Sequence, residues 1–127
     1  MGVFLMKKTI LVVDDEKDLV EIVESHLDEA GYRIVTAEDG IEGLEVAHRE
    51  KPNLIILDIK MPRMNGLEML EALRRTPGLE TIPVLMLTAQ GRSTNIFEAD
   101  ALRAVDFIIK PFTQADLFSA VRKVLGN

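Results

Sequence analysis

Four short apolar runs are spaced along the 127-residue chain. They are TILVV at 9–13, LIIL at 54–57, VLML at 84–87 and FII at 107–109. Such runs, which lack polar alternation, predict strands that are buried on both faces of a sheet. The segment YRIVTA at 32–37 alternates more weakly and includes polar residues, so we predict a fifth strand there, at an edge of the sheet.

Apolar residues recur at helical spacing between the predicted strands. Three predicted helices contain, in chain order, Leu19, Ile22, Val23, Leu27 and Ala30, then Ile41, Leu44, Val46 and Ala47, then Leu67, Leu70 and Leu73. Gly31 is expected to end the first of them, and two more helices are predicted from Thr94 to about Leu102 and from Thr113, a candidate N-cap, to Leu125. Strands that alternate with helices predict an α/β fold, a doubly wound (βα)5 domain with a parallel sheet and helices on both faces.

Length and composition agree with one globular domain. A chain of 127 residues, 47% of them hydrophobic, can bury a single core, and disorder is not expected. Residues 7–127 are assigned to this domain, and residues 1–6 to an N-terminal extension that is either disordered or an alternative start. No run of 18 apolar residues occurs, so membrane insertion is not expected.

Charge and cysteine content exclude several classes of function. The chain has 15 basic and 21 acidic residues, a net charge of −6, which opposes contact with a phosphate backbone and disfavours direct nucleic-acid binding. It has no cysteine, which excludes disulfides, thiolate nucleophiles and Cys-ligated metals. The same absence suits a reducing compartment, and we predict a cytoplasmic location.

Functional side chains follow four of the predicted strands, at the point where each strand ends. Asp14 and Asp15 follow the first run, Asp58 the second, Thr88 the third and Lys110 the fourth. Open α/β sheets place their sites beyond the carboxyl ends of the strands. We therefore expect these five side chains to converge on one crevice.

The carboxylates in this crevice would repel one another unless a cation neutralised them. Mg²⁺ suits the predicted set, because it takes oxygen ligands and often binds through one or two carboxylates together with a phosphate. Asp58 stands alone and is the better candidate for a nucleophile that forms an acyl phosphate, whereas Asp14 and Asp15 form a pair suited to the metal. Lys110 and the Thr88 hydroxyl would then bind the phosphoryl oxygens.

Four motifs combine into one specific pattern. They are VVDDE at 12–16, LDIKMPRMNG at 57–66, LTA at 87–89 and FIIKPF at 107–112. In order and separation they resemble the receiver domain of bacterial two-component response regulators, and the resemblance covers residues 7–126. It implies a flavodoxin-like fold with a five-stranded parallel sheet in the order 2-1-3-4-5. It also implies a signalling switch rather than an enzyme, a phosphoacceptor that assists its own phosphorylation and dephosphorylation.

The resemblance assigns roles to the residues of the acidic site. Asp58 would accept a phosphoryl group from the phosphohistidine of a sensor histidine kinase or a histidine phosphotransfer protein. Mg²⁺ would be held by Asp14, Asp15, Asp58 and the backbone carbonyl of Lys60.

The resemblance also implies an output. Thr88 and Lys110 would bind the phosphoryl oxygens, and Thr88 and Phe107 would be the switch residues. Phosphorylation would shift a two-state population, and the face formed by the fourth helix, fifth strand and fifth helix would then bind a downstream protein.

The chain departs from the family pattern shortly before Phe107. Arg103 stands where glycine is usual, and Val105 where aspartate is usual. Because glycine serves the left-handed conformation at helix ends, we expect the preceding helix to end differently. Lys60 and Gln90 occupy positions whose side chains tune the lifetime of the acyl phosphate in the family.

The same residues admit other interpretations. Carboxylates after the first strand would also suit a helix N-terminus, and we assign Glu16 to that capping role. An FMN-binding flavodoxin-like protein would share the fold, but the acidic DDEKD segment would repel its phosphate. An aspartate-dependent phosphatase needs a D-x-D spacing, which Asp58, Ile59 and Lys60 do not supply. Within the receiver class, a single-domain regulator of chemotaxis type and a domain cropped from a larger transcription factor or hybrid kinase would look alike.

Overall fold

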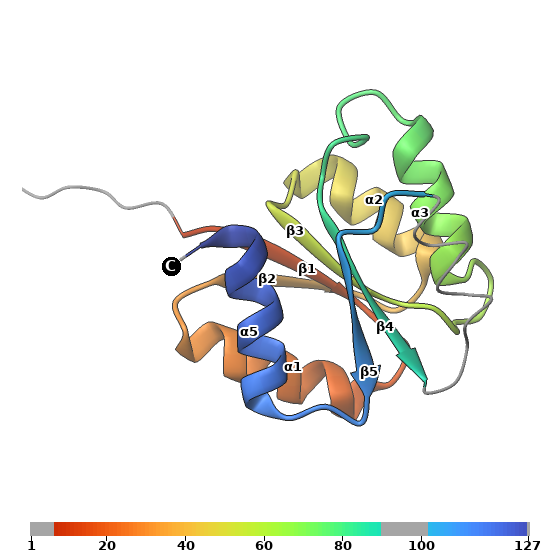
Figure 1. The fold of residues 1–127 in the computed structure, drawn as a ribbon. Coiled ribbons are helices and arrows are strands. Elements are labelled where there is room, and N and C mark those ends of the chain that lie inside the picture. The colour runs from red at the N-terminus through yellow and green to blue at the C-terminus, as the bar shows by residue number, and fades with distance from the viewer. Residues whose placement is uncertain (1–6, 90–101, 127) are drawn as a thin grey trace, which may run out of the picture.

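The structure, a computed structural model, describes residues 7–89 and 102–126 and is built on one five-stranded parallel sheet (Figure 1). The strands are β1 (Thr9–Val13), β2 (Arg33–Ala37), β3 (Leu54–Asp58), β4 (Val84–Ala89) and β5 (Asp106–Lys110). Their order is β2-β1-β3-β4-β5, which confirms the flavodoxin-like topology and places β2 at an edge, as predicted. The extension predicted at 1–6, Gln90 and all but the end of the helix predicted from Thr94 lie outside the described residues.

Helices cover both faces of the sheet. Helices α1 (Lys17–Glu29) and α5 (Gln114–Leu125) lie on one face, and α2 (Gly40–Glu50) and α3 (Gly66–Arg75) on the other (Figure 1). Successive strand residues point to opposite faces, so Val12 packs on the α1 and α5 side and Val13 on the α2 and α3 side. The central strand β3 is buried at every position, as the run LIIL predicts. None of the helices in the described ranges is long and apolar enough to span a membrane.

Local sequence signals explain where several helices begin and end. Asn65 and Glu68 form a capping box at the start of α3, and Thr113 and Asp116 form another at the start of α5, which confirms the N-cap predicted at Thr113. Gly31 follows α1 with a φ of 97°, a conformation that glycine adopts without a steric penalty. The boundaries of these helices therefore follow from short segments of sequence.

Three isoleucines that we expected on buried faces are exposed. The exposed fractions are 52% for Ile22, 41% for Ile41 and 52% for Ile109. Ile22 is adjacent to Val23, which is fully buried against the sheet. Because adjacent residues of a helix point in different directions, the two side chains cannot both face the sheet. The prediction that every apolar run is buried on both faces was wrong for β5, because β5 is an edge strand with a neighbour on one side only.

Arg103 adopts the conformation that glycine usually provides. Its φ is 63°, so the side chain does not prevent the left-handed backbone, although the helix that we expected to end differently lies outside the described residues. The guanidinium of Arg74, on α3, donates hydrogen bonds to the carbonyl oxygens of Leu102 and Arg103 at 2.9 and 3.0 Å. These bonds hold the segment before β5, and we attribute the tolerance of a side chain at position 103 to them.

Candidate functional site

The carboxyl ends of four parallel strands meet at one edge of the sheet. Asp14 directly follows β1, Asp58 ends β3, Thr88 is the penultimate residue of β4, and Lys110 ends β5. Asp58 pairs in register with Leu87, so Thr88 lies one residue further along the neighbouring strand. The parallel topology therefore brings residues from widely separated parts of the chain to one crevice.

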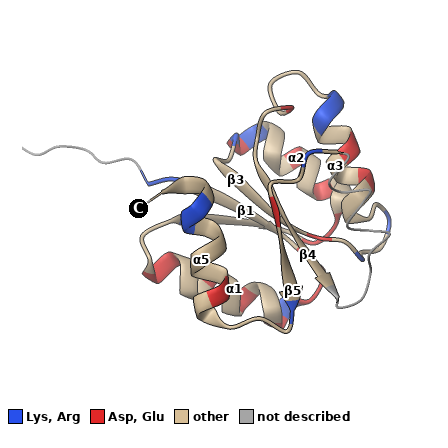
Figure 2. Ribbon diagram, viewed as in Figure 1, with Lys and Arg blue, Asp and Glu red and all other residues tan. Residues whose placement is uncertain are grey.

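The ammonium group of Lys110 lies among three carboxylates. Its Nζ is 3.2 Å from Asp58 Oδ1, 3.4 Å from Asp14 Oδ2 and 3.2 Å from Glu16 Oε1. Asp14 and Asp58 are buried, whereas the side chain of Glu16 is 63% exposed. Figure 2 shows the basic tip of β5 beside acidic segments of the chain. The two buried carboxylates are thus partly neutralised by one cation.

Burial raises the pKa of both aspartates. The pKa of Asp14 rises from 3.8 to about 6, mainly because burial penalises the charged form, and the nearby Asp58 adds to the rise. Burial likewise raises the pKa of Asp58, against the opposing effect of Lys110. Burial alone would lower the pKa of Lys110, but the two carboxylates outweigh it and raise that pKa. The single ammonium of Lys110 thus does not balance the negative charge of the carboxylates in the crevice.

The acidic cluster fits a hard divalent cation. Carboxylate oxygens of Asp14, Glu16 and Asp58 lie within 4.8 Å of one another. This donor set consists of oxygen atoms only, which Mg²⁺ prefers, and a divalent cation would supply the missing positive charge. The site thus has the ligand chemistry and the charge that the predicted cofactor requires.

Asp15 and Glu16 are oriented differently from our expectations. The side chain of Asp15 is exposed and lies outside this cluster, although its charge contributes to the raised pKa of Asp58. Glu16 occupies the N-cap position of α1, but its side chain makes no capping hydrogen bond. Its backbone N–H instead donates to Asp14 Oδ1 at 3.0 Å, and its carboxylate faces Lys110. The position of Glu16 at the N-cap is thus confirmed, but its carboxylate does not cap the helix by a hydrogen bond, and the sequence carries no local signal for this orientation.

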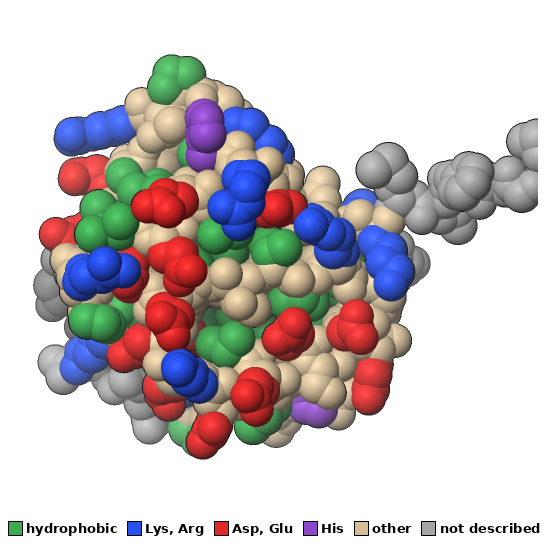
Figure 3. Space-filling view, turned by 180° about the vertical axis from the view of Figure 1, so that it is seen from behind, with side chains coloured by type: hydrophobic (Ala, Val, Ile, Leu, Met, Phe, Trp, Pro, Cys, Tyr) green, Lys and Arg blue, Asp and Glu red, His purple; other side chains and the backbone are tan. Residues whose placement is uncertain are grey.

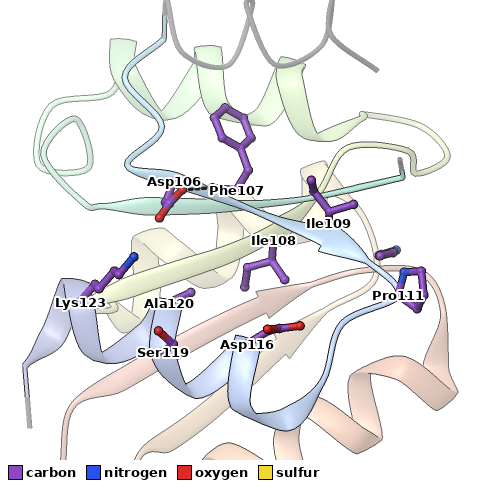
Figure 4. Close-up of a pocket in the computed structure, with 10 residues that line it drawn as sticks. Asp106, Phe107, Ile108, Ile109, Pro111, Asp116, Ser119, Ala120 and Lys123 are labelled. Carbon is purple, nitrogen blue, oxygen red and sulfur yellow. Dashed lines mark hydrogen bonds between the residues drawn. The ribbon is translucent and has the colours of Figure 1, made fainter. Parts of the chain in front are cut away.

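The remaining predicted residues surround the crevice or lie beside it. Thr88 is 2% exposed, and Lys60 is exposed in the loop after β3. Phe107 is half-buried and packs against the core on the α2 and α3 side, so its ring points away from α5 (Figure 4). The roles predicted for these side chains remain predictions.

Comparisons with known proteins agree with this geometry. The family model of the response regulator receiver domain matches residues 10–122. The probable transcriptional regulator ycf27 of Cyanophora paradoxa is 40% identical over 119 residues, covering 94% of this chain and 48% of the relative. The alkaline phosphatase synthesis transcriptional regulatory protein PhoP of Bacillus subtilis (strain 168) is 38% identical over 120 residues, covering 94% of this chain and 49% of the relative. The solved structure of chemotaxis protein CheY4 of Vibrio cholerae matches with a TM-score of 0.89 and 33% identity, covering 94% of this chain and 99% of that chain.

The fold and the acidic site are those of a receiver domain, a signalling domain. The chain belongs to the response regulator receiver domain family, which confirms the resemblance read from its motifs. It spans about half the length of the curated relatives it matches. Members of this family act as signalling switches in two-component systems and generally use Mg²⁺ at an acidic site.

Proposed function

We propose that this chain is a phosphorylation-activated switch in which Asp58 is the phosphoacceptor. The observation that carries the proposal is the position of the Lys110 ammonium, which contacts the buried carboxylates of both Asp58 and Asp14. A buried carboxylate beside a fixed cation is suited to attack a phosphoryl group, because the lysine stabilises the negative charge that the product carries.

The phosphoryl donor is proposed to be a phosphohistidine on a sensor histidine kinase or a histidine phosphotransfer protein. A carboxylate oxygen of Asp58 attacks phosphorus in line with the departing histidine nitrogen, so that an O–P bond forms as the N–P bond breaks. The nitrogen keeps the electron pair of the broken bond. Lys110 and the Thr88 hydroxyl bind the phosphoryl oxygens, and in this way the chain assists its own phosphorylation.

Asp14 and Asp58 are proposed to hold Mg²⁺, with Asp15 and the Lys60 carbonyl as the additional ligands that the family resemblance implies. The cluster of carboxylate oxygens, whose third member is Glu16, and the raised pKa values of Asp14 and Asp58 support the part of this assignment that concerns Asp14 and Asp58. When bound, the ion would neutralise the carboxylates and the charge of the phosphoryl group.

The output surface is proposed to include the groove between β5 and α5. Figure 4 shows Ile108 directed toward α5, with Phe107 and Ile109 on the opposite side of the strand. Lys110 ends β5, so a movement of its ammonium toward a phosphoryl group acts on the strand that forms one wall of this groove. Phosphorylation would then shift the population of Thr88 and Phe107 conformers and alter this face for a downstream protein.

The partner of the output surface is proposed to be a protein. Asp and Glu side chains are interspersed with Lys and Arg over the face seen in Figure 3, and the net charge of −6 disfavours direct binding of nucleic acid by this domain. Two architectures accommodate the domain. A single-domain regulator is supported by the match to CheY4, which covers 99% of the CheY4 chain. The receiver of a longer transcriptional regulator is supported by the matches to ycf27 and PhoP, which cover 48% and 49% of those relatives. Either architecture implies a cytoplasmic location.

The decisive experiment uses acetyl phosphate as a small phosphoryl donor, followed by intact-mass measurement. We expect the wild type to gain one phosphoryl group with Mg²⁺ and none when EDTA removes the metal. Asp58→Asn should gain none, whereas Asp18→Asn, which neutralises an exposed carboxylate on α1, should behave as the wild type. An equal gain on Asp58→Asn would contradict the proposal.

A further inference from the structure

A buried aspartate ties two loops near the acidic site together. The carboxylate of Asp39 accepts hydrogen bonds from Nε of Arg63 at 2.7 Å and from Nη2 of the same guanidinium. It also accepts the backbone N–H of Glu42 at 2.9 Å, as the N-cap of α2. Asp39 is 4% exposed, and the Glu42 N–H together with Arg63 lowers its pKa. The carboxylate therefore stays ionised and paired at neutral pH.

The same two loops are joined by a second contact. The backbone N–H of Gly40 donates to the carbonyl oxygen of Met64 at 3.0 Å, and a side chain at Gly40 would collide with Met64. Arg63 has a φ of 63°, a left-handed conformation that is uncommon for a residue with a side chain. Such a conformation persists when surrounding contacts determine it, and the bonds from Asp39 supply contacts of that kind.

The loop that Asp39 holds begins at the phosphoacceptor. It runs from Asp58 to the start of α3 and contains Lys60. A hydrogen bond joins the two ends of this loop, because the backbone N–H of Gly66 donates to the Ile59 carbonyl oxygen at 2.8 Å. Asp39 is also linked to the acidic site, because the carbonyl oxygen of Ala37, at the end of β2, accepts a hydrogen bond from the backbone N–H of Asp14 at 3.1 Å.

We propose that Asp39 and Arg63 are positioning residues that hold the loop between β3 and α3, so that the Lys60 carbonyl is presented to the divalent cation. This inference rests on the proposed function, because it requires a cation beside Asp58. Neither Asp39 nor Arg63 is assigned a direct role in phosphoryl transfer. Their contribution is to the affinity of the site for the metal.

The test is the affinity for Mg²⁺ in variants that break the ion pair without removing the local backbone features. Arg63→Gly removes the guanidinium and permits the left-handed φ, and Asp39→Asn retains an acceptor for the Glu42 N–H. Each should raise the Mg²⁺ dissociation constant about fivefold, less than the ~10–100-fold typical of groups that bond to a metal ligand directly. Arg63→Lys, which keeps the charge but not the paired bonds, should lie between these variants and the wild type.

Mg²⁺ binding is measured by NMR titration of the metal-free protein, and the Mg²⁺ dependence of phosphorylation by acetyl phosphate is measured in parallel. The half-saturating Mg²⁺ concentration should rise with the dissociation constant, while the rate at saturating Mg²⁺ stays within about twofold of the wild-type rate. The double variant should be no weaker than either single variant, because the two side chains act as one pair. Arg75→Ala, which breaks an exposed ion pair with Glu71 on α3, should leave the Mg²⁺ dissociation constant and the half-saturating Mg²⁺ concentration unchanged.

Wild-type Mg²⁺ affinity in both Arg63→Gly and Asp39→Asn would overturn the inference, as would additive effects in the double variant. A purely structural role would lower the thermal unfolding midpoint without changing the dissociation constant at a temperature where each variant is folded, and that result also counts against it. If the wild type binds Mg²⁺ but is not phosphorylated, the proposed function fails, and the titrations still decide the role of the pair.

Discussion

Removing the charge of Asp14 should make the metal-free protein more stable, although the variant loses its cation site. Asp14 is 2% exposed, and its pKa rises from 3.8 to about 6 on folding. At about 1.4 kcal/mol per pKa unit, this rise corresponds to about 3 kcal/mol of unfavourable free energy for the ionised group at neutral pH. Asparagine avoids this term and can still accept the Glu16 N–H, but it loses the attraction to Lys110 and introduces an amide that needs acceptors. We therefore expect Asp14→Asn to raise the free energy of unfolding by about 1–2 kcal/mol.

The sign of the pH dependence follows from the direction of the pKa change. Because the pKa of Asp14 is higher in the folded than in the unfolded chain, the stability associated with its proton is fully present below pH 3.8 and is lost as the pH rises through about 6. Asparagine has no proton to lose at this position. The advantage of Asp14→Asn should thus be near zero below pH 4 and should reach its full size above about pH 7.

Urea unfolding followed by circular dichroism, in EDTA and at a series of pH values, measures this advantage directly. Adding Mg²⁺ should stabilise the wild type, because the ion binds the folded state, but not the variant, so the order of stability should reverse at high Mg²⁺. Asp18→Asn, which removes an exposed carboxylate, should stay within about 0.5 kcal/mol of the wild type. An Asp14→Asn protein that is no more stable than the wild type at pH 7.5 in EDTA would refute the reasoning.

Three further variants probe other parts of the structure. Glu16→Gln removes a competing carboxylate from Lys110 and should strengthen binding of beryllofluoride with Mg²⁺ by up to about threefold, an effect that salt should weaken. A ¹⁹F NMR titration measures the affinity for beryllofluoride, and weaker binding by the variant would contradict this prediction. Gly66→Ala places a methyl group against backbone atoms of residues 58–59 and should lower the free energy of unfolding by about 3 kcal/mol or more; a loss below about 1 kcal/mol in urea unfolding would argue against this crowding. Arg74→Met leaves four backbone carbonyls without their donor and should destabilise by about 2–4 kcal/mol in the same assay, whereas a neutral result would show that water replaces the guanidinium.

Much of the site was predictable because its placement follows from periodicity. The burial pattern of the strands identifies where each strand ends, and parallel strands present those ends at one edge of the sheet. Asp14, Asp58 and Lys110 therefore had to approach one another once the fold was a parallel α/β sheet, and their side chains are in contact. The edge position of β2 was predictable from its weaker, more polar alternation, and the N-cap at Thr113 from a short local segment.

Side-chain directions in loops were not predictable. Whether the carboxylate of Glu16 or of Asp15 faces Lys110 depends on rotamers and on the turn after β1, and both residues carry the same charge. The pairing of Asp39 with Arg63 joins loops that are 24 residues apart in sequence, and no local pattern marks such a contact.

By itself, then, the sequence determined the topology and the chemical identity of the crevice, because hydrophobic periodicity and the residues at strand ends are local properties of the chain. Only the tertiary structure decided which carboxylates share the lysine, how far burial raises their pKa values, and which loop contacts hold the rim of the site. Those features depend on distances between segments that are remote along the chain, and such distances exist only after the core has packed.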